Sequence, residues 1–160
     1  LLTVTGFTLA HSVTLSLAAL NIFRLPTELV EWLIALSILL LAVEIIKRGR
    51  AGDNAKDSFT WRHPLSVSTV FGLLHGFGFA VVLQELGLPA SMKIEALLFF
   101  NIGVEVGQLL FIAVIVIATM LALRGVPALK SRAAVLTEVV VYGIGITSAY
   151  WLVERAGAVL

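Results

Sequence analysis

Five polar side chains lie in the middle of long apolar segments of this sequence. They are two imidazoles, one carboxylate and two amides, namely His11, His75, Glu105, Asn101 and Gln108. The last three are spaced i, i+4 and i+7, so they share one face of a helix. Imidazole nitrogen and carboxylate oxygen are ligands suited to nickel, zinc, copper or iron, whereas magnesium and calcium prefer oxygen alone. We therefore predict a transition-metal site built from these residues.

Each of these residues also has a plainer interpretation. A lone histidine within a membrane often only joins helices through hydrogen bonds, which contribute about 0.6 kcal/mol on average. Thr8 and Ser12 are near His11 in the sequence and would orient an imidazole ligand. Glu44 and Glu138 lie near the ends of apolar segments, where a solvated carboxylate is as good an interpretation as a functional one. We nevertheless include Glu44 in the predicted metal site, as a carboxylate that would bind the ion as it leaves the membrane (an exit station).

The amino-acid composition is typical of a membrane protein and not of a water-soluble one. Of 160 residues, 59% are hydrophobic and 13% are charged, and the mean hydropathy is +1.04. Globular proteins carry roughly 25% charged residues, so the composition excludes a soluble enzyme core. The sequence has no cysteine, which excludes disulfides and thiolate metal sites. It shows no basic face for nucleic acid apart from short linkers.

We predict an all-α fold, a polytopic transmembrane helical bundle that forms a single domain over residues 1–160. A membrane-spanning helix needs about 20 mostly apolar residues. Five stretches qualify, at residues 1–20, 28–46, 64–86, 93–123 and 133–153. The fourth would be about 46 Å long, so it must tilt or project beyond the bilayer.

The distribution of lysine and arginine predicts the orientation. The linkers 47–63 and 124–132 carry eight of the eleven basic residues and fall on the same side of a five-span topology. The opposite side has only Arg24, Lys93 and Arg155. We therefore expect both linkers to be cytoplasmic and the C-terminus to be periplasmic. His63, among the basic residues of the first linker, is expected to be an exposed loop residue.

Small residues predict where helices approach closely. Gly72, Gly76 and Gly78 in the third stretch, and Gly103 and Gly107 in the fourth, have the spacing that lets helix backbones touch. We expect these two helices to be drawn together around the polar residues. The phenylalanines near the predicted site are expected to pack against it or seal it; they are Phe77, Phe79, Phe99 and Phe100.

Three segments resemble the HupE/UreJ family of bacterial membrane proteins. They are FTLAHSVTL at residues 7–15, FGLLHGFGFA at 71–80 and FNIGVEVGQL at 100–109. Members of this family are regarded as nickel, or cobalt, permeases of the inner membrane. The resemblance implies that the five mid-membrane polar residues correspond to the family's polar motif positions.

One departure from the family concerns the start of the chain. Family members usually begin with an additional span that carries a His-x5-Asp-His motif, and this sequence has none. We therefore expect an upstream span, six spans in the full protein, and part of the metal site outside the present sequence.

The sequence thus predicts a transporter rather than an enzyme, acting on a divalent transition metal ion. The resemblance favours nickel, while cobalt, copper and zinc also suit the ligands. The expected partners are the lipid bilayer, the metal ion, and a second copy of the chain or an upstream periplasmic segment. Two alternatives stay open, an intramembrane metal-dependent or acid–base enzyme acting on lipid, and an assembly protein whose polar residues only join helices.

Overall fold

The computed structural model describes residues 2–51, 59–85, 92–126 and 128–159, and this part of the chain is helical with short turns. The helices, in chain order, are α1 (Leu2–Ala19), α2 (Thr27–Ala51), α3 (Phe59–Arg62), α4 (Pro64–Glu85), α5 (Lys93–Gly125) and α6 (Ala128–Val159). No strand occurs among the described residues, and the predicted all-α fold is confirmed.

Each of the five long helices contains most or all of one predicted span, although α2 and α6 are longer than the predicted spans 28–46 and 133–153; the short helix α3 lies within the predicted linker 47–63. Within the described ranges, four helices are long and apolar enough to cross a membrane, in α1, α2, α5 and α6. α4 is helical over 22 residues, and its segment Pro64–Ala80, the part of α4 whose side chains are described, is apolar. The number of five crossings therefore stays a prediction, and it depends on α4.

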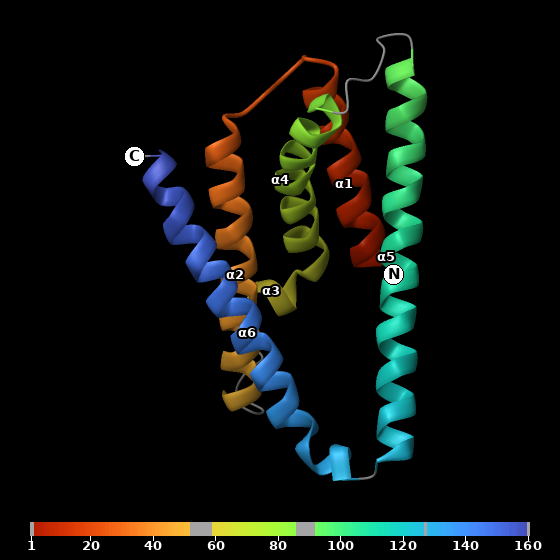
Figure 1. Ribbon diagram of the computed structural model, residues 1–160, viewed down its shortest axis with the longest axis vertical. Coiled ribbons are helices and arrows are strands. Elements are labelled where there is room, and N and C mark those ends of the chain that lie inside the picture. The colour runs from red at the N-terminus through yellow and green to blue at the C-terminus, as the bar shows by residue number, and fades with distance from the viewer. Residues whose placement is uncertain (1, 52–58, 86–91, 127, 160) are drawn as a thin grey trace.

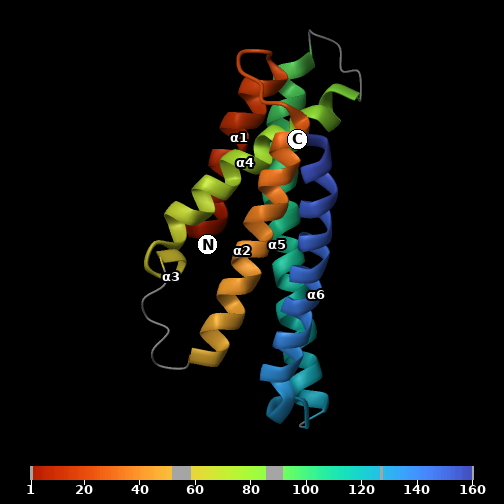
Figure 2. The same cartoon turned by 90° about the vertical axis from the view of Figure 1, so that its left-hand side faces the viewer.

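The long helices alternate in direction, so neighbours along the chain are antiparallel (Figure 1). α1 packs most closely against α4, and α2 against α6; α2 also contacts α4, and α1 contacts α5. Figure 2 shows the α1–α4 pair on the side of the bundle away from α6. α2, α5 and α6 extend beyond α1 and α4 at the lower end of Figure 1. The polar residues of α1 and α4 thus come together in the tightest helix pair.

Local sequence signals explain where the helices begin and end. Pro64 is the first residue of α4, a position where its missing N–H costs nothing and its fixed φ suits a helix. Pro26 directly precedes α2. Asn21 follows α1 with φ of 62°, a left-handed conformation that asparagine tolerates better than most residues.

The side chains of α5 and α6 are largely exposed although they are apolar. Phe99 and Phe111 are 71% and 68% exposed, and in water such a surface would be an aggregation hazard. A lipid environment explains both the exposure and the helical structure, since every backbone group must be satisfied internally there. A small core at one end of α1 joins three helices through Leu15, Ala80 and Leu97.

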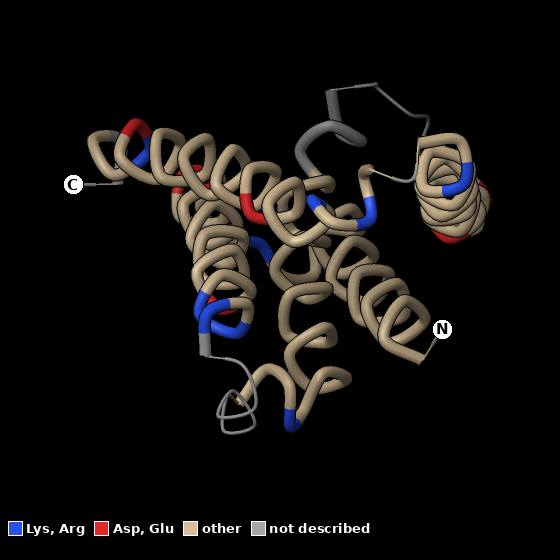
Figure 3. The backbone as a smooth tube through the Cα atoms, turned by 90° about the horizontal axis from the view of Figure 1, so that it is seen from below, with Lys and Arg blue, Asp and Glu red and all other residues tan. Residues whose placement is uncertain are grey.

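Lys and Arg gather at the lower end of the bundle, as Figure 3 shows from that end. α2 ends there, and α5 and α6 meet there. This end carries basic residues of both predicted linkers, including Arg50, Arg124 and Arg132. Described basic residues of the two predicted linkers thus lie at the same end of the bundle, and the side of the membrane that this end faces stays a prediction.

Candidate metal site

His11 lies in the middle of α1 and is buried to 1% exposure. Neither ring nitrogen has a hydrogen-bond partner within the described part of the chain. A neutral imidazole has one donor and one acceptor nitrogen, and each buried polar group left unpaired costs about 1–3 kcal/mol. An imidazole in this state is poorly accounted for as a packing residue alone.

His75 lies half-buried on α4 and has one nitrogen occupied. Its Nδ1 is 2.7 Å from the carbonyl oxygen of Phe71, one turn earlier. A carbonyl oxygen can only accept, so we assign the proton to Nδ1, which leaves the lone pair of Nε2 free. A backbone carbonyl that fixes the tautomer in this way is the usual arrangement behind a metal-binding histidine.

The two imidazoles meet around the ring of Phe7. The ring centroids of Phe7 and His11 are 5.9 Å apart and stacked, and those of Phe7 and His75 are 5.4 Å apart, edge to face. Phe79 covers His11 from α4, with the centroids 5.4 Å apart. The site therefore combines two histidines with aromatic side chains from both α1 and α4.

Phe7 was not predicted to belong to the site, although the sequence contains a signal for it. It lies four residues before His11, and residues at this spacing share a helix face. Among the phenylalanines expected to pack or seal, Phe79 does so, whereas Phe99 points outward and is 71% exposed.

Glycines bring α4 against α1 beside His11. A Cβ atom at Gly76 would overlap the carbonyl oxygen of His11 and the hydroxyl of Thr14, and one at Gly72 would overlap the Phe7 backbone. Close approach at these positions was predicted, but the expected partner was wrong. A Cβ atom at Gly103 or Gly107 of α5 would meet nothing within 4 Å. Gly72 and Gly76 of α4 thus pack on α1, and Gly78 packs on Ile34 of α2, instead of on α5.

α5 presents its polar residues on the face predicted for them. Asn101, Val104, Glu105 and Gln108 are half-buried, while their neighbours on the helix are mostly exposed. Gln108 accepts a hydrogen bond of 3.1 Å from Thr8 of α1. Asn101 donates to the carbonyl oxygen of Leu97 at 2.9 Å, and its own Oδ1 is buried without a partner within the described part of the chain.

The structure does not gather all predicted ligands into one cluster. In the described ranges, no group of three or more His, Asp or Glu side chains is close enough to hold a metal ion. Glu105 is half-buried on α5 and Glu44 half-buried on α2, and neither forms a hydrogen bond or ion pair with a described residue. The structure therefore brings together the two histidines and places the two carboxylates apart from them.

Two polar residues outside the predicted metal site, Glu138 and His63, have clear surroundings. Glu138 accepts hydrogen bonds from Arg50 at 2.8 and 3.2 Å, so it forms an ion pair between α6 and α2. His63 is exposed between α3 and α4, as predicted, and contacts the ring of Phe59. Neither residue belongs to the candidate site.

Long apolar helices around buried, unpaired imidazole and amide groups define a multi-pass α-helical membrane protein with a polar centre. The sequence matches the family described as HupE / UreJ protein over residues 1–155, and the chain belongs to this family. The family is linked to nickel and cobalt transport, so the protein is a metal transporter in general terms and not an enzyme. Comparison with curated proteins and with solved structures gave no significant match.

Proposed function

We propose that the protein moves a divalent transition metal ion, with nickel favoured, through a site centred on His11 and His75. The observation that carries this proposal is the state of His11, which is 1% exposed and whose ring nitrogens have no partner among the residues that the structure describes. The free Nε2 of His75 supports it, because the two rings contact the same side chain of Phe7. Nitrogen ligands of this kind suit nickel, cobalt, copper and zinc.

The residues of α5 would complete the site from the other side of α1. Glu105 would supply a carboxylate ligand or balance the charge of the ion, and the unpaired Oδ1 of Asn101 would supply an amide oxygen. Gln108 would keep α5 in place through its bond to Thr8. Glu44, further along α2, would receive the ion as an exit station.

The proposed setting is the bacterial inner membrane. The end of the bundle that carries the linkers 47–63 and 124–132 would face the cytoplasm, since basic linkers are retained there. The C-terminus of α6 would then lie in the periplasm. The concentration of Lys and Arg at this end supports this orientation.

Nickel uptake by cells that lack other nickel transporters tests the proposal. His11→Ala and His75→Ala are expected to reduce uptake to the level of cells without the protein, while membrane insertion stays normal. His63→Ala is the matched control, because this exposed histidine lies outside the site, and its uptake should equal that of the wild type. Unchanged uptake of nickel, cobalt, copper and zinc in both site variants would contradict the proposal. Loss of thermal stability alone, with uptake retained, would favour the interpretation that the histidines only join helices.

A further inference from the structure

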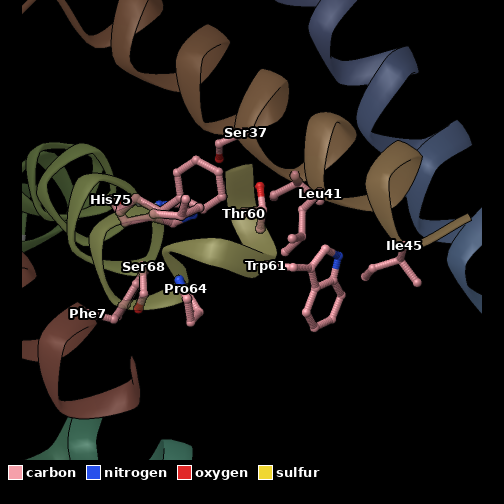
Figure 4. A pocket seen from close by; sticks show the side chains of 12 residues that line it. Phe7, Ser37, Leu41, Ile45, Thr60, Trp61, Pro64, Ser68 and His75 are labelled. Atoms are coloured by element: carbon pink, nitrogen blue, oxygen red, sulfur yellow. Dashed lines mark hydrogen bonds between the residues drawn. The ribbon is translucent and has the colours of Figure 1, made fainter. Parts of the chain in front are cut away.

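A cavity of about 500 Å³ lies between α1, α2, α3 and α4, beneath the histidine pair. Figure 4 shows it with His75 and Phe7 at one end and Trp61 and Ile45 at the other. Its size is within the range of about 300–1,000 Å³ that ligand sites usually have. The cavity is distinct from the metal ligands, of which only His75 reaches its wall.

The walls of this cavity favour a hydrocarbon ligand. Most of the lining side chains are aliphatic or aromatic. Two of the hydroxyls in the wall are already occupied, since Ser37 donates to the carbonyl oxygen of Ile34 at 2.7 Å and Ser68 donates to that of Thr3. A polar ligand would therefore lose hydrogen bonds to water on entering, whereas an apolar chain would lose none.

One face of α2 forms a stripe that runs along the cavity and ends in a cation. Ile38, Leu41 and Ile45 line the wall, and Arg48 continues the same spacing of three and four residues, so it lies on the same face. The stripe from Ile38 to Arg48 is about 15 Å long at 1.5 Å per residue.

Arg48 stacks on Trp61 at the cavity wall, and its N–H groups have no partner among the described residues. Its guanidinium carbon lies 3.8 Å from the ring centroid of Trp61, and Trp61 is itself part of the cavity wall. Stacking uses the flat face of the guanidinium and leaves its five N–H donors at the edge. Arg48 makes no hydrogen bond or ion pair with the described residues, so it is available to an anion.

We propose that this cavity binds one acyl chain of an anionic phospholipid, with the lipid phosphate held by Arg48. The apolar stripe matches the chain and the guanidinium matches the phosphate, which it can bind through two parallel hydrogen bonds. The end of the chain would lie against Phe7 and His75, and would keep water away from the histidine pair on that side. This proposal is independent of which ion the protein moves.

Fluorescence quenching by brominated lipids tests the proposal directly, because Trp61 lines the cavity. One protein retains Trp61 alone, with Trp32→Phe and Trp151→Phe; a second retains Trp151 alone. Each is reconstituted in phosphatidylcholine vesicles that contain a minor fraction of lipid with brominated chains, either phosphatidylglycerol or phosphatidylcholine. We expect brominated phosphatidylglycerol to quench Trp61 more strongly than brominated phosphatidylcholine does. Trp151, on α6 outside the cavity, should be quenched equally by both lipids.

Two variants of the Trp61 protein separate the phosphate contact from the chain contact. Arg48→Gln should lower the preference for the anionic lipid about fivefold, the effect of one cation near a membrane surface, whereas Arg132→Gln at the same end of the bundle should not. Val67→Phe fills the cavity and should weaken quenching by both lipids. Equal quenching of Trp61 by the two lipids would overturn the proposal, and this comparison needs no change to the cavity or to Arg48. A preference that survives Arg48→Gln would overturn it as well.

Discussion

Thr8 of α1 donates a hydrogen bond of 3.1 Å to the side chain of Gln108 on α5, which it shares with the carbonyl oxygen of Val4 in its own helix at the same distance. The two helices are antiparallel (Figure 1), so moving from Thr8 towards His11 corresponds to moving from Gln108 towards Glu105. One hydrogen bond between helices thus sets the depth at which the carboxylate of Glu105 lies relative to the buried imidazole of His11. It links the packing of α5 to the geometry of the candidate site.

Removing this bond is expected to affect stability slightly and uptake more. Thr8→Val and Gln108→Leu should each lower the free energy of unfolding, and a double-mutant cycle should give a coupling of about 0.6 kcal/mol, the mean for hydrogen bonds between membrane helices. Thr147→Val is the control, since this exposed hydroxyl bonds only to the carbonyl oxygen of Gly143 in its own helix. Unfolding in detergent measures the cycle. A coupling of zero would show that the bond does not hold α5 in place.

The close approach of α4 to α1 makes Gly76 sensitive to any side chain. Gly76→Ala is expected to lower the free energy of unfolding by about 1–3 kcal/mol, as overpacking does, because the added methyl group overlaps the His11 carbonyl oxygen and Thr14. It should also reduce nickel uptake by moving His11. Gly103→Ala is the matched control, with open space at its Cβ, and should be neutral or stabilise by up to about 1 kcal/mol. Equal effects of the two substitutions on unfolding would contradict the close packing of α4 on α1.

The sequence predicts helices well here because hydropathy alone determines them. The five apolar stretches became five helices, since a lipid-exposed backbone must satisfy its hydrogen bonds internally. Helix pairing is different, because the same small-residue pattern occurs at Gly76 and at Gly103, yet only Gly76 packs against another helix. The spacing of residues along one helix predicts which face carries small or polar side chains, but it does not predict which other helix packs against that face.

In the candidate site too, the features set within one helix could be predicted, whereas those set by the packing of helices could not. Its histidines could be recognised in the sequence because placing a polar group in hydrocarbon costs free energy, however the helices are packed. The contact of Phe7 with His11 follows from their spacing in one helix, but its contact with His75 depends on how α1 and α4 pack. The hydrogen bond from Thr8 to Gln108 joins residues from opposite halves of the chain, and no local sequence pattern predicts it.

The packing of α2 against α6 can be tested by a disulfide. A Cβ atom at Gly145 would lie 3.4 Å from the Cβ of Ala42, close to the separation of about 3.8 Å found in disulfides. The double variant Ala42→Cys, Gly145→Cys should therefore oxidise readily, and the chain has no other cysteine to interfere. Free thiols are counted by their reaction with a maleimide of high mass, with and without reductant. Ala42→Cys with Gly143→Cys should stay reduced, because the Cβ position at Gly143 has no neighbour within 4 Å. Oxidation of the control pair alone would mean that α6 is rotated.

Single cysteines in the turns test both the orientation and the number of crossings. Ile22 follows α1 and Ser131 lies in the first turn of α6; both are exposed, and three helices, α2, α4 and α5, separate them. If all three cross the membrane, Ile22→Cys and Ser131→Cys must lie on opposite sides, whereas both lie on the same side if α4 does not cross. In cells with a permeabilised outer membrane, we expect an impermeant maleimide to label Ile22→Cys and not Ser131→Cys, and inverted membrane vesicles should give the opposite result. The expectation follows from the basic residues around Ser131, which favour retention in the cytoplasm. Labelling of both positions from one side would mean that α4 does not cross and that the crossings are limited to α1, α2, α5 and α6.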